Sequence, residues 1–442
     1  MTVTPAPAMI HLDGSTLEGG GQLVRIAVAL SVLTGKPVNV TNIRGNRQGR
    51  KGLKRSHVAA VQFLAQLTGG SVSGAEVGSS ILSFYPAQPL SRQDGGSPAV
   101  QRDVEIELPT AGSIFLVFQA VYPYLLYACE SPTRLTITGG TNVPFSPSFD
   151  YVSQVLIPNF ARLGLPPLAV HLEKRGWATG PTSLGRVALV IDPLSAQDRQ
   201  CPRFPRIDFA QFQRGQVTRV DITILAPDDP LEGGPERTTN RRSGWRAERP
   251  AGDHQDRPPD HSQTVRGFIE CEAHRQLRTR LRRLPPWLYT CRSEAFSTTV
   301  ESAIPVRTHA SESTSHPSQI YLLLVAHTST GFKIGYDALS GAMKTGGPRS
   351  KRRDGANRAA TAAQSLVDAC VDGFIRELHD PQLQADPVAA LRQPCVDEKM
   401  RDQLVVFEAL GGKPGDEQSE DERYWSLHTL TAQWVCREML EE

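Results

Sequence analysis

The sequence predicts an α/β fold that contains repeated β-α-β-α-β-β units. Three observations lead to this prediction. Segments whose apolar residues have helical spacing alternate with strand-like segments, the connections between them are short, and the pattern recurs in the first half of the chain. Helices that pack on sheets satisfy such an alternation. At 442 residues the chain is long enough for two domains.

The first unit is bounded by glycine and capping signals. Gly35 and Pro37 stop the first helix, Ser56 is a suitable N-cap for the second, and Gly69-Gly70 turn the chain after it. Its predicted elements are a helix at 22–34, a strand at 37–43, a helix at 56–68 and strands at 71–77 and 79–85.

The second unit repeats the first loosely. "ITGG" at 137–140 echoes "LTGG" at 67–70, and Pro123 is expected to kink or end a helix. The predicted elements are a strand at 103–108, a helix at 112–128, a strand at 134–140, a helix at 149–163 and strands at 168–174 and 186–192.

The composition changes in the middle of the chain. Residues 229–265 are rich in Pro, Gly, Arg and Asp and almost lack aliphatic side chains, which predicts disorder. The basic segment "RTRLRRLPPW" at 278–287 is typical of a solvated face. Order returns at 319–327. Further helices are predicted at 358–378, 401–412 and 428–440.

Composition and charge exclude some classes of protein. Hydrophobic residues make up 39% and charged residues 21%, and the net charge of +2 does not indicate a nucleic-acid binder. The most apolar segment, 113–128, is interrupted and shorter than the ~20 residues of a membrane span. No signal-peptide pattern opens the chain, and the seven cysteines form no CxxC pair. We therefore expect a nuclear (nucleoplasm or nucleolus) or cytoplasmic protein that is not secreted.

Three consecutive glycines, Gly19, Gly20 and Gly21, precede the first helix in "LEGGGQLVR". Glycines allow close backbone approach, and the first N–H groups of a helix lack internal partners, so the segment can bind an anion such as phosphate. Arg25 would strengthen that contact, whereas Glu18 would repel it unless Mg²⁺ bridges the two. The alternative is a tight turn that packs the helix against a sheet.

A dense basic loop follows at 43–57, "IRGNRQGRKGLKRSH", and suits a polyanion such as a nucleoside triphosphate or an RNA backbone. The alternative is a solvated loop. No aromatic residue interleaves the charges, so base stacking is not indicated in this loop. The chain has no P-loop and no strand-linked GxGxxG motif. His428 is expected at or just before a helix start, where a neutral imidazole can act as a base, a ligand or a nucleophile toward phosphorus.

Five segments, in this order, resemble the RNA 3'-terminal phosphate cyclase family: "LDGSTLEGGGQLVR", "IRGNR…GLKRSH", "GGTNVPFSP" (139–147), "RDQLV" (401–405) and "HTLT" (428–431). The resemblance covers residues 10–195 well and 395–440 moderately. It implies an ATP-dependent enzyme that converts an RNA 3'-phosphate to a 2',3'-cyclic phosphate through a covalent histidine-AMP, with Mg²⁺ or Mn²⁺. Its partners would be RNA 3'-phosphate ends and ATP, with no membrane.

The resemblance also implies roles for single residues. His428 falls on the nucleophile and Glu18 on the acid that holds the metal. The residues that would bind the nucleotide are Gly19, Gly20, Gly21, Gln22, Arg25, Gln119, Pro147 and Asp402. The residues that would bind the RNA end are Arg44, Arg47 and His57. Pro147 would pack against adenine, and Asp402 belongs to the "DQL" motif.

The chain departs from the family pattern at three places. The segment 175–187 lacks the Tyr-Pro and Gly-triplet loop that approaches the active site in relatives. Arg401 stands where small residues are common, and the middle of the chain is longer than usual.

The implied architecture is a large domain of three or so repeated units, in segments 1–193 and 376–442, with a smaller α/β domain inserted at 194–375. The main alternative is a catalytically inactive cyclase-like factor in ribosomal RNA processing and ribosome assembly, whose members typically lack the histidine. An enolpyruvyl-transferase-like enzyme or an RNA-binding scaffold are more distant alternatives.

Overall fold

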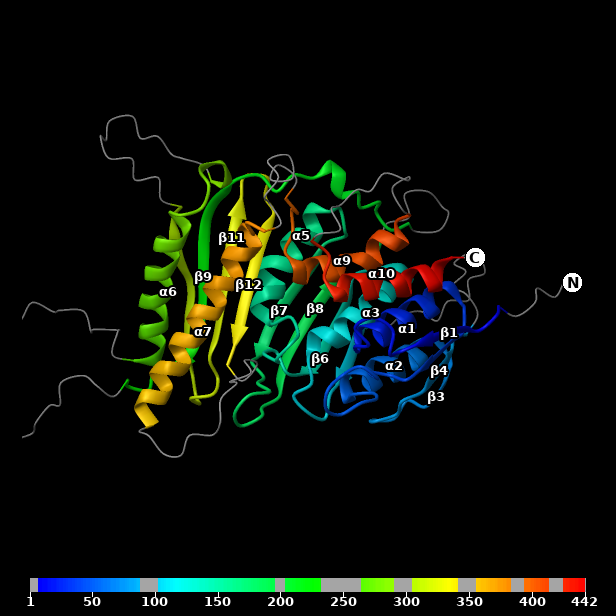
Figure 1. Ribbon diagram of the computed structural model, residues 1–442. Helices are drawn as coiled ribbons and strands as arrows, with labels where there is room; N and C mark the ends of the chain where they lie inside the picture. Colours follow the sequence, from blue (N-terminus) through cyan, green and yellow to red (C-terminus); the bar gives the residue numbers. More distant parts are fainter. Residues whose placement is uncertain are drawn as a thin grey trace, which may run out of the picture.

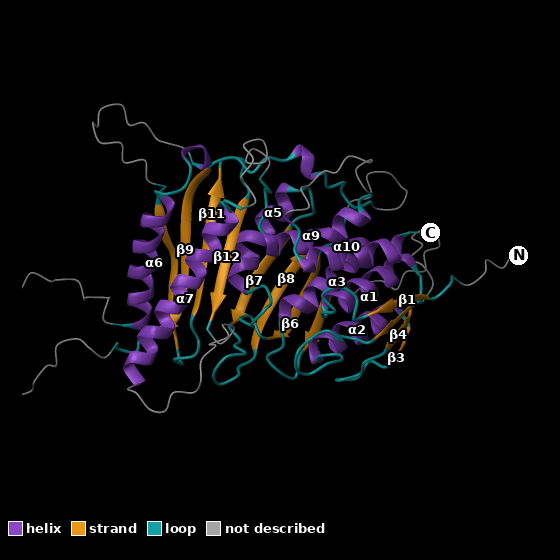
Figure 2. Cartoon of the chain, in the orientation of Figure 1, coloured by secondary structure: helices purple, strands orange, loops and turns teal. Residues whose placement is uncertain are grey.

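The computed structural model describes residues 7–87, 102–194, 203–231, 264–289, 304–340, 355–382, 393–412 and 424–441. The strands of this part of the chain form three four-stranded sheets. The sheets lie in a row with helices packed on them (Figures 1 and 2). This confirms the predicted α/β class. Residues 232–263, most of the segment predicted to be disordered, lie outside the described residues.

The first two sheets are built in the same way, and each is a β-α-β-α-β-β unit. The first consists of β1 (Ile10–Asp13), α1 (Gln22–Thr34), β2 (Val38–Thr41), α2 (Arg55–Thr68), β3 (Ser71–Ser73) and β4 (Leu82–Tyr85), with strand order β1-β2-β4-β3. The second consists of β5 (Asp103–Glu107), α3 (Ile114–Ala128), β6 (Thr133–Gly139), α4 (Phe149–Tyr151), η2 (Val152–Leu156), α5 (Ile157–Arg162), β7 (Leu168–Lys174) and β8 (Gly185–Ile191), with order β5-β6-β8-β7. In both units the first two strands are parallel and the remaining pairs are antiparallel.

The third sheet has a different order, β10-β9-β11-β12. After η3 (Phe209–Gln211), its elements are β9 (Val217–Pro227), α6 (Val265–Leu281), η5 (Pro286–Leu288), β10 (Val306–Thr314), β11 (Tyr321–Thr328), β12 (Lys333–Leu339) and α7 (Gly355–Leu378). Only β11 and α7 correspond to segments that the sequence analysis identified as ordered. The chain ends with α9 (Glu398–Leu410) and α10 (Leu427–Leu440), and α10 lies along α1 (Figure 1).

Two helix starts, and the passage of α3 through Pro123, differ from the prediction. Lys54, not Ser56, is the N-cap of α2, and the Nδ1 atom of His57, three residues on, accepts the Lys54 backbone N–H at 3.1 Å. The helix α3 continues through Pro123, which is buried among apolar side chains that stabilise the helix around it. The helix α9 begins three residues early, since the Asp397 side chain caps it by accepting the Met400 N–H at 2.9 Å.

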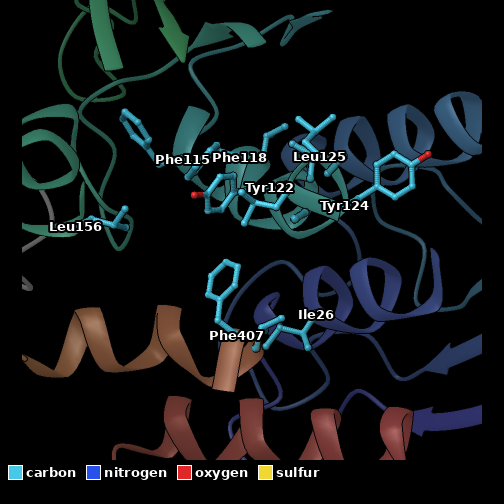
Figure 3. Packing of buried hydrophobic residues seen from close by; sticks show 14 of the residues in the cluster. Ile26, Phe115, Phe118, Tyr122, Tyr124, Leu125, Leu156 and Phe407 are labelled. Carbon is cyan, nitrogen blue, oxygen red and sulfur yellow. The ribbon is translucent and has the colours of Figure 1, made fainter. Parts of the chain in front are cut away.

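The buried side chains form two clusters. The larger joins both repeated units with α9 and α10, and the smaller lies between the third sheet and its helices, from Val217 to Leu378. In the larger cluster Phe407 of α9 points toward α3 (Figure 3). Its ring lies 5.7 Å from that of Tyr122 and 5.4 Å from that of Phe160. The domain boundaries after residues 193 and 375 stay predictions. None of the described helices is long and apolar enough to cross a membrane.

Candidate functional site

A cavity of about 450 Å³ lies where the two repeated units, the third sheet and the C-terminal helices meet. It falls within the usual range of ligand pockets, ~300–1,000 Å³. Six predicted site residues line it: Gln22, Arg25, Gln119, Pro147, Asp402 and His428. They come from five segments of the chain, α1, α3, the loop before α4, α9 and α10, which the fold brings together.

His428 is the second residue of α10 and is held by side chains at the start of α1. Its Nδ1 atom lies 3.0 Å from the Gln22 Oε1 and 3.0 Å from a carboxylate oxygen of Glu18. Because both neighbours are acceptors, a neutral ring keeps its proton on Nδ1. The Nε2 atom then carries the free lone pair, which is what a nucleophile needs. The Glu18 N–H also donates to Thr431 Oγ1 at 3.3 Å and joins α10 to the glycine turn.

The imidazole of His428 is neutral at physiological pH. Burial, together with the positive charges of Arg47 and Arg25, lowers its pKa to about 4. Protonation, which removes the lone pair, then requires a pH near 4 rather than near 6.5.

We expect an NMR titration of histidine-labelled protein to show this shift directly. The imidazole signal that is lost in His428→Gln should titrate with a midpoint about two units below an ordinary histidine, near pH 4. A midpoint at 6 or above would show that the ring is more hydrated than its contacts indicate.

The glycine triplet makes room for site side chains. Gly19 has a φ of +61°, which an L side chain rarely adopts. A Cβ on Gly20 would lie 2.6 Å from the Glu18 Oε2, and one on Gly21 would lie 2.2 Å from the His57 Nε2. The turn therefore packs tightly, as one of the two alternatives predicts, and it lies at the N-terminus of α1; anion binding there stays a prediction.

Arg25 lies buried in the wall of the cavity. Its Nε donates to the Gln119 Oε1 at 2.9 Å, and its Nη1 lies 3.5 Å from the His57 Nε2. Burial lowers the pKa of Arg25 only to about 10, so the guanidinium stays charged. Burial and the nearby charges of Arg25, Arg44 and Lys54 lower the pKa of His57 well below its ordinary value. At neutral pH His57 therefore adds no positive charge.

The basic loop is partly committed to its own structure. The Arg44 Nη1 donates to the backbone oxygens of Arg50 at 2.6 Å and Gly52 at 3.4 Å, while Arg47 forms an ion pair with Glu18. Arg47 and Glu18 lie beside the cavity rather than in its lining.

Glu18 can contribute one oxygen to a metal. Its Oε2 is buried and lies 3.0 Å from the His428 Nδ1, whereas its Oε1 pairs with Arg47. Among the described residues no group of three or more His, Cys, Asp or Glu side chains could hold a metal by itself. A divalent cation therefore fits here only if ligand oxygens, such as phosphate oxygens, complete its shell.

Asp402 joins α9 to α10. Its Oδ1 accepts from the Thr429 Oγ1 at 2.7 Å and from Ser426, the N-cap of α10, at 3.1 Å. Burial raises the pKa of Asp402 to about 7. Asp402 therefore fixes the turn of helix that carries His428.

The third sheet contributes a polar wall that sequence analysis missed. Asp337 of β12 pairs with Lys399 and accepts from the Tyr321 Oη at 3.0 Å. The same hydroxyl lies 2.5 Å from the Ser148 Oγ, and the Lys399 Nζ lies 4.7 Å from the centre of the Tyr151 ring. The only sequence signal near this group was the position of Lys399, three residues before Asp402.

Two departures from the family pattern have a structural account. Gly176 forms backbone hydrogen bonds with Thr141 and Asn142 at 2.9 and 3.0 Å, so the segment 175–187 packs beside the loop that lines the cavity. The buried Arg401 forms an ion pair with Glu408 at 2.7 Å and lies over the ring of Phe209.

Comparison with known proteins finds one family and many relatives. A family model described as RNA 3'-terminal phosphate cyclase matches residues 16–442. Proteins named RNA 3'-terminal phosphate cyclase are similar to this chain. That of Desulfurococcus amylolyticus is 44% identical over 158 residues, 36% of this chain and 41% of the relative. That of Methanosarcina acetivorans is 44% identical over 185 residues, which make up 42% of this chain and 48% of the relative. That of Methylococcus capsulatus is 39% identical over 183 residues, which make up 41% of this chain and 48% of the relative. The matches thus span less than half of these curated relatives.

Proposed function

Because the chain belongs to the RNA 3'-terminal phosphate cyclase family, we propose that it converts RNA 3'-phosphates to 2',3'-cyclic phosphates at the expense of ATP. The observation that carries this proposal is the position of His428. Its imidazole is neutral, its Nδ1 faces two acceptors, and its Nε2 is free beside a cavity that contains a buried, charged arginine.

The proposed reaction has three displacements at phosphorus. In the first, the His428 Nε2 attacks the α-phosphorus of ATP, an N–P bond forms, and the bond to the bridging oxygen breaks to release pyrophosphate. In the second, an oxygen of the RNA 3'-phosphate displaces His428 and takes up the AMP. In the third, the neighbouring 2'-hydroxyl attacks the terminal RNA phosphorus and loses its proton, and AMP leaves with the electron pair. Adenylylation supplies the leaving group, and the last attack is intramolecular and therefore fast.

The other residues would bind and orient. Arg25 would neutralise phosphate charge, held in place by Gln119, while the N–H groups that follow Gly19, Gly20 and Gly21 would donate to phosphate oxygens. Pro147 would pack against adenine, and Asp402 would keep His428 in position. Gln22 would hold the Nδ1 proton. The RNA end would meet Arg44, Arg47 and His57, with Arg47 the most exposed of the three.

A divalent cation, Mg²⁺ or Mn²⁺, would offset the charge of the triphosphate and favour release of pyrophosphate. Glu18 would hold it through the buried carboxylate oxygen that faces the His428 Nδ1. The compartment, nuclear or cytoplasmic, stays a prediction.

Labelling tests the proposal. The protein is incubated with α-³²P-labelled ATP and Mg²⁺, denatured, and examined for label that is acid-labile and alkali-stable, the signature of a phosphoramidate. Label on the protein, followed by a cyclic phosphate on an added 3'-phosphorylated RNA, supports the enzyme. Absence of label together with co-purifying pre-ribosomal RNA would favour the inactive assembly factor.

A substitution separates the two tasks that Glu18 could perform. If Glu18 holds the metal, Glu18→Gln should raise the Mg²⁺ concentration for half-maximal adenylylation by about 10-fold or more. The amide oxygen of glutamine can still face the His428 Nδ1, so the orientation of the ring should change little. Glu76→Gln, at an exposed acid in another loop, is the matched control. An unchanged Mg²⁺ dependence would contradict the metal-holding role.

A further inference from the structure

Phe145 is the most exposed large hydrophobic side chain among the described residues, at 86%, and it lines the cavity. The three residues that follow it, Ser146 to Ser148, are buried. The aromatic ring is therefore at the mouth of the cavity, while its neighbours form the wall behind it. An exposed apolar surface beside a ligand pocket suggests a contact made by the ligand.

The exposure is built into the loop. Phe145 has a φ of +61°, an unusual backbone conformation for an aromatic residue. The loop is fixed on both sides of it: the Ser146 Oγ donates to the Val143 carbonyl at 2.9 Å, and the Phe149 N–H donates to the Thr141 carbonyl at 3.1 Å. Backbone outliers that the surroundings hold in place cluster at ligand contacts.

We propose that Phe145 is the platform on which the 3'-terminal base of the RNA stacks, an inference that rests on the proposed function. The shared chemistry is the flat face of a nucleobase, which either ATP or RNA could supply. The structure favours RNA. A nucleotide inside the cavity meets the buried Pro147, whereas a polymer whose 3' end enters from solvent must pass the rim, where the Phe145 ring lies. The sequence supplied no stacking aromatic in the basic loop, and Phe145 provides one from the other repeated unit.

Stacking of this kind tolerates any base, since every base has a π face. Phe145 would therefore position the RNA terminus without selecting its sequence. The basic groups would bind the phosphate, and the ring would fix the angle at which the terminal ribose approaches His428.

Binding without catalysis tests the proposal. The dissociation constant of a short fluorescent RNA with a 3'-phosphate is measured by anisotropy in the absence of ATP. Phe145→Ala should weaken binding by about 5- to 150-fold. An RNA whose terminal nucleotide is abasic should lose a similar factor on the native protein and nothing further on Phe145→Ala. Phe145→Trp should restore binding, and Tyr85→Ala, at an exposed aromatic residue outside the cavity lining, should change nothing.

Three outcomes would overturn the proposal. One is an unchanged RNA affinity in Phe145→Ala, and another is additive losses from the variant and the abasic RNA. The third is a rise in the KM for ATP during histidine adenylylation, because the ring would then contact adenine. The binding assay needs no turnover, so an absence of the histidine-AMP would refute the proposed function and leave this measurement interpretable. Unchanged Tm values would confirm that the variants fold, as expected for a residue so exposed.

Discussion

His428→Ala will abolish covalent labelling of the protein by ATP and lower the rate of RNA cyclisation by at least about a thousandfold. No other described side chain that lines the cavity is a histidine or a cysteine. The amine of Lys399 also lines it, but, despite its burial, its ion pair with Asp337 raises its pKa and keeps it protonated, so it cannot replace the Nε2 atom as nucleophile. The His428 side chain is 45% exposed, and its removal leaves no core cavity. The protein should therefore stay folded and keep its affinity for ATP within a few-fold.

A matched histidine controls for general damage. His379 lies next to Trp287, with ring centres 6.1 Å apart, and does not line the cavity. His379→Ala should label like the native protein. Labelling that survives in His428→Ala would place the nucleophile elsewhere, and with it the cavity would lose its assigned chemistry.

The largest effect on stability is expected from Phe407→Ala, which should lower the free energy of unfolding by about 3–5 kcal/mol. The side chain is 4% exposed and meets the rings of Tyr122 and Phe160 edge-on. Its loss removes buried apolar area and leaves a void next to Tyr122 of α3, toward which the Phe407 ring points (Figure 3). Chemical denaturation of the full chain, followed by fluorescence, measures the change.

A second, smaller substitution at position 407 distinguishes a loss of packing from misfolding. Phe407→Leu should cost clearly less than Phe407→Ala, because leucine retains most of the buried area. If both variants lose less than about 1 kcal/mol, α9 contributes little to the core. Since Asp402 lies one and a half turns before Phe407 on α9, a strongly destabilised variant should also label more weakly with ATP.

The site was predicted where its residues lie in local motifs. The glycine turn, the "DQL" segment and His428 each have a recognisable pattern. Gln22 and Arg25, which follow the turn, line one cavity together with Asp402 and His428, while the roles of these residues stay predictions. The contacts that hold them could not be read from the chain. Residues such as Asp337 and Lys399 pair across 62 positions, and Tyr321 reaches Ser148 across 173. Spacing in the sequence carries no information on such distant pairs.

The same limit explains why the edge strand of the third sheet was not predicted from the sequence. The edge strand β10 is largely exposed and has no alternating apolar pattern, so tertiary pairing with β9 determines its conformation. By contrast, β9 has 11 mostly buried residues, and its apolar sequence could have been predicted as a strand. The N-cap of α2 was missed for a different, local reason. The His57 side chain accepts the Lys54 backbone N–H, so the helix is capped two residues before Ser56.

The first two sheets have the same strand order, and this has a consequence for which side chains each unit presents at the site. The connection after β2, residues 42–54, and the connection after β6, residues 140–148, occupy equivalent places in two copies of one module. Each holds a non-glycine residue with a left-handed backbone, Arg44 in one copy and Phe145 in the other. The first connection carries basic side chains, and the second carries an exposed aromatic ring. Each connection is anchored in its own sheet. A substitution in one connection can therefore alter the ligand contacts made there without changing the structure of the other connection.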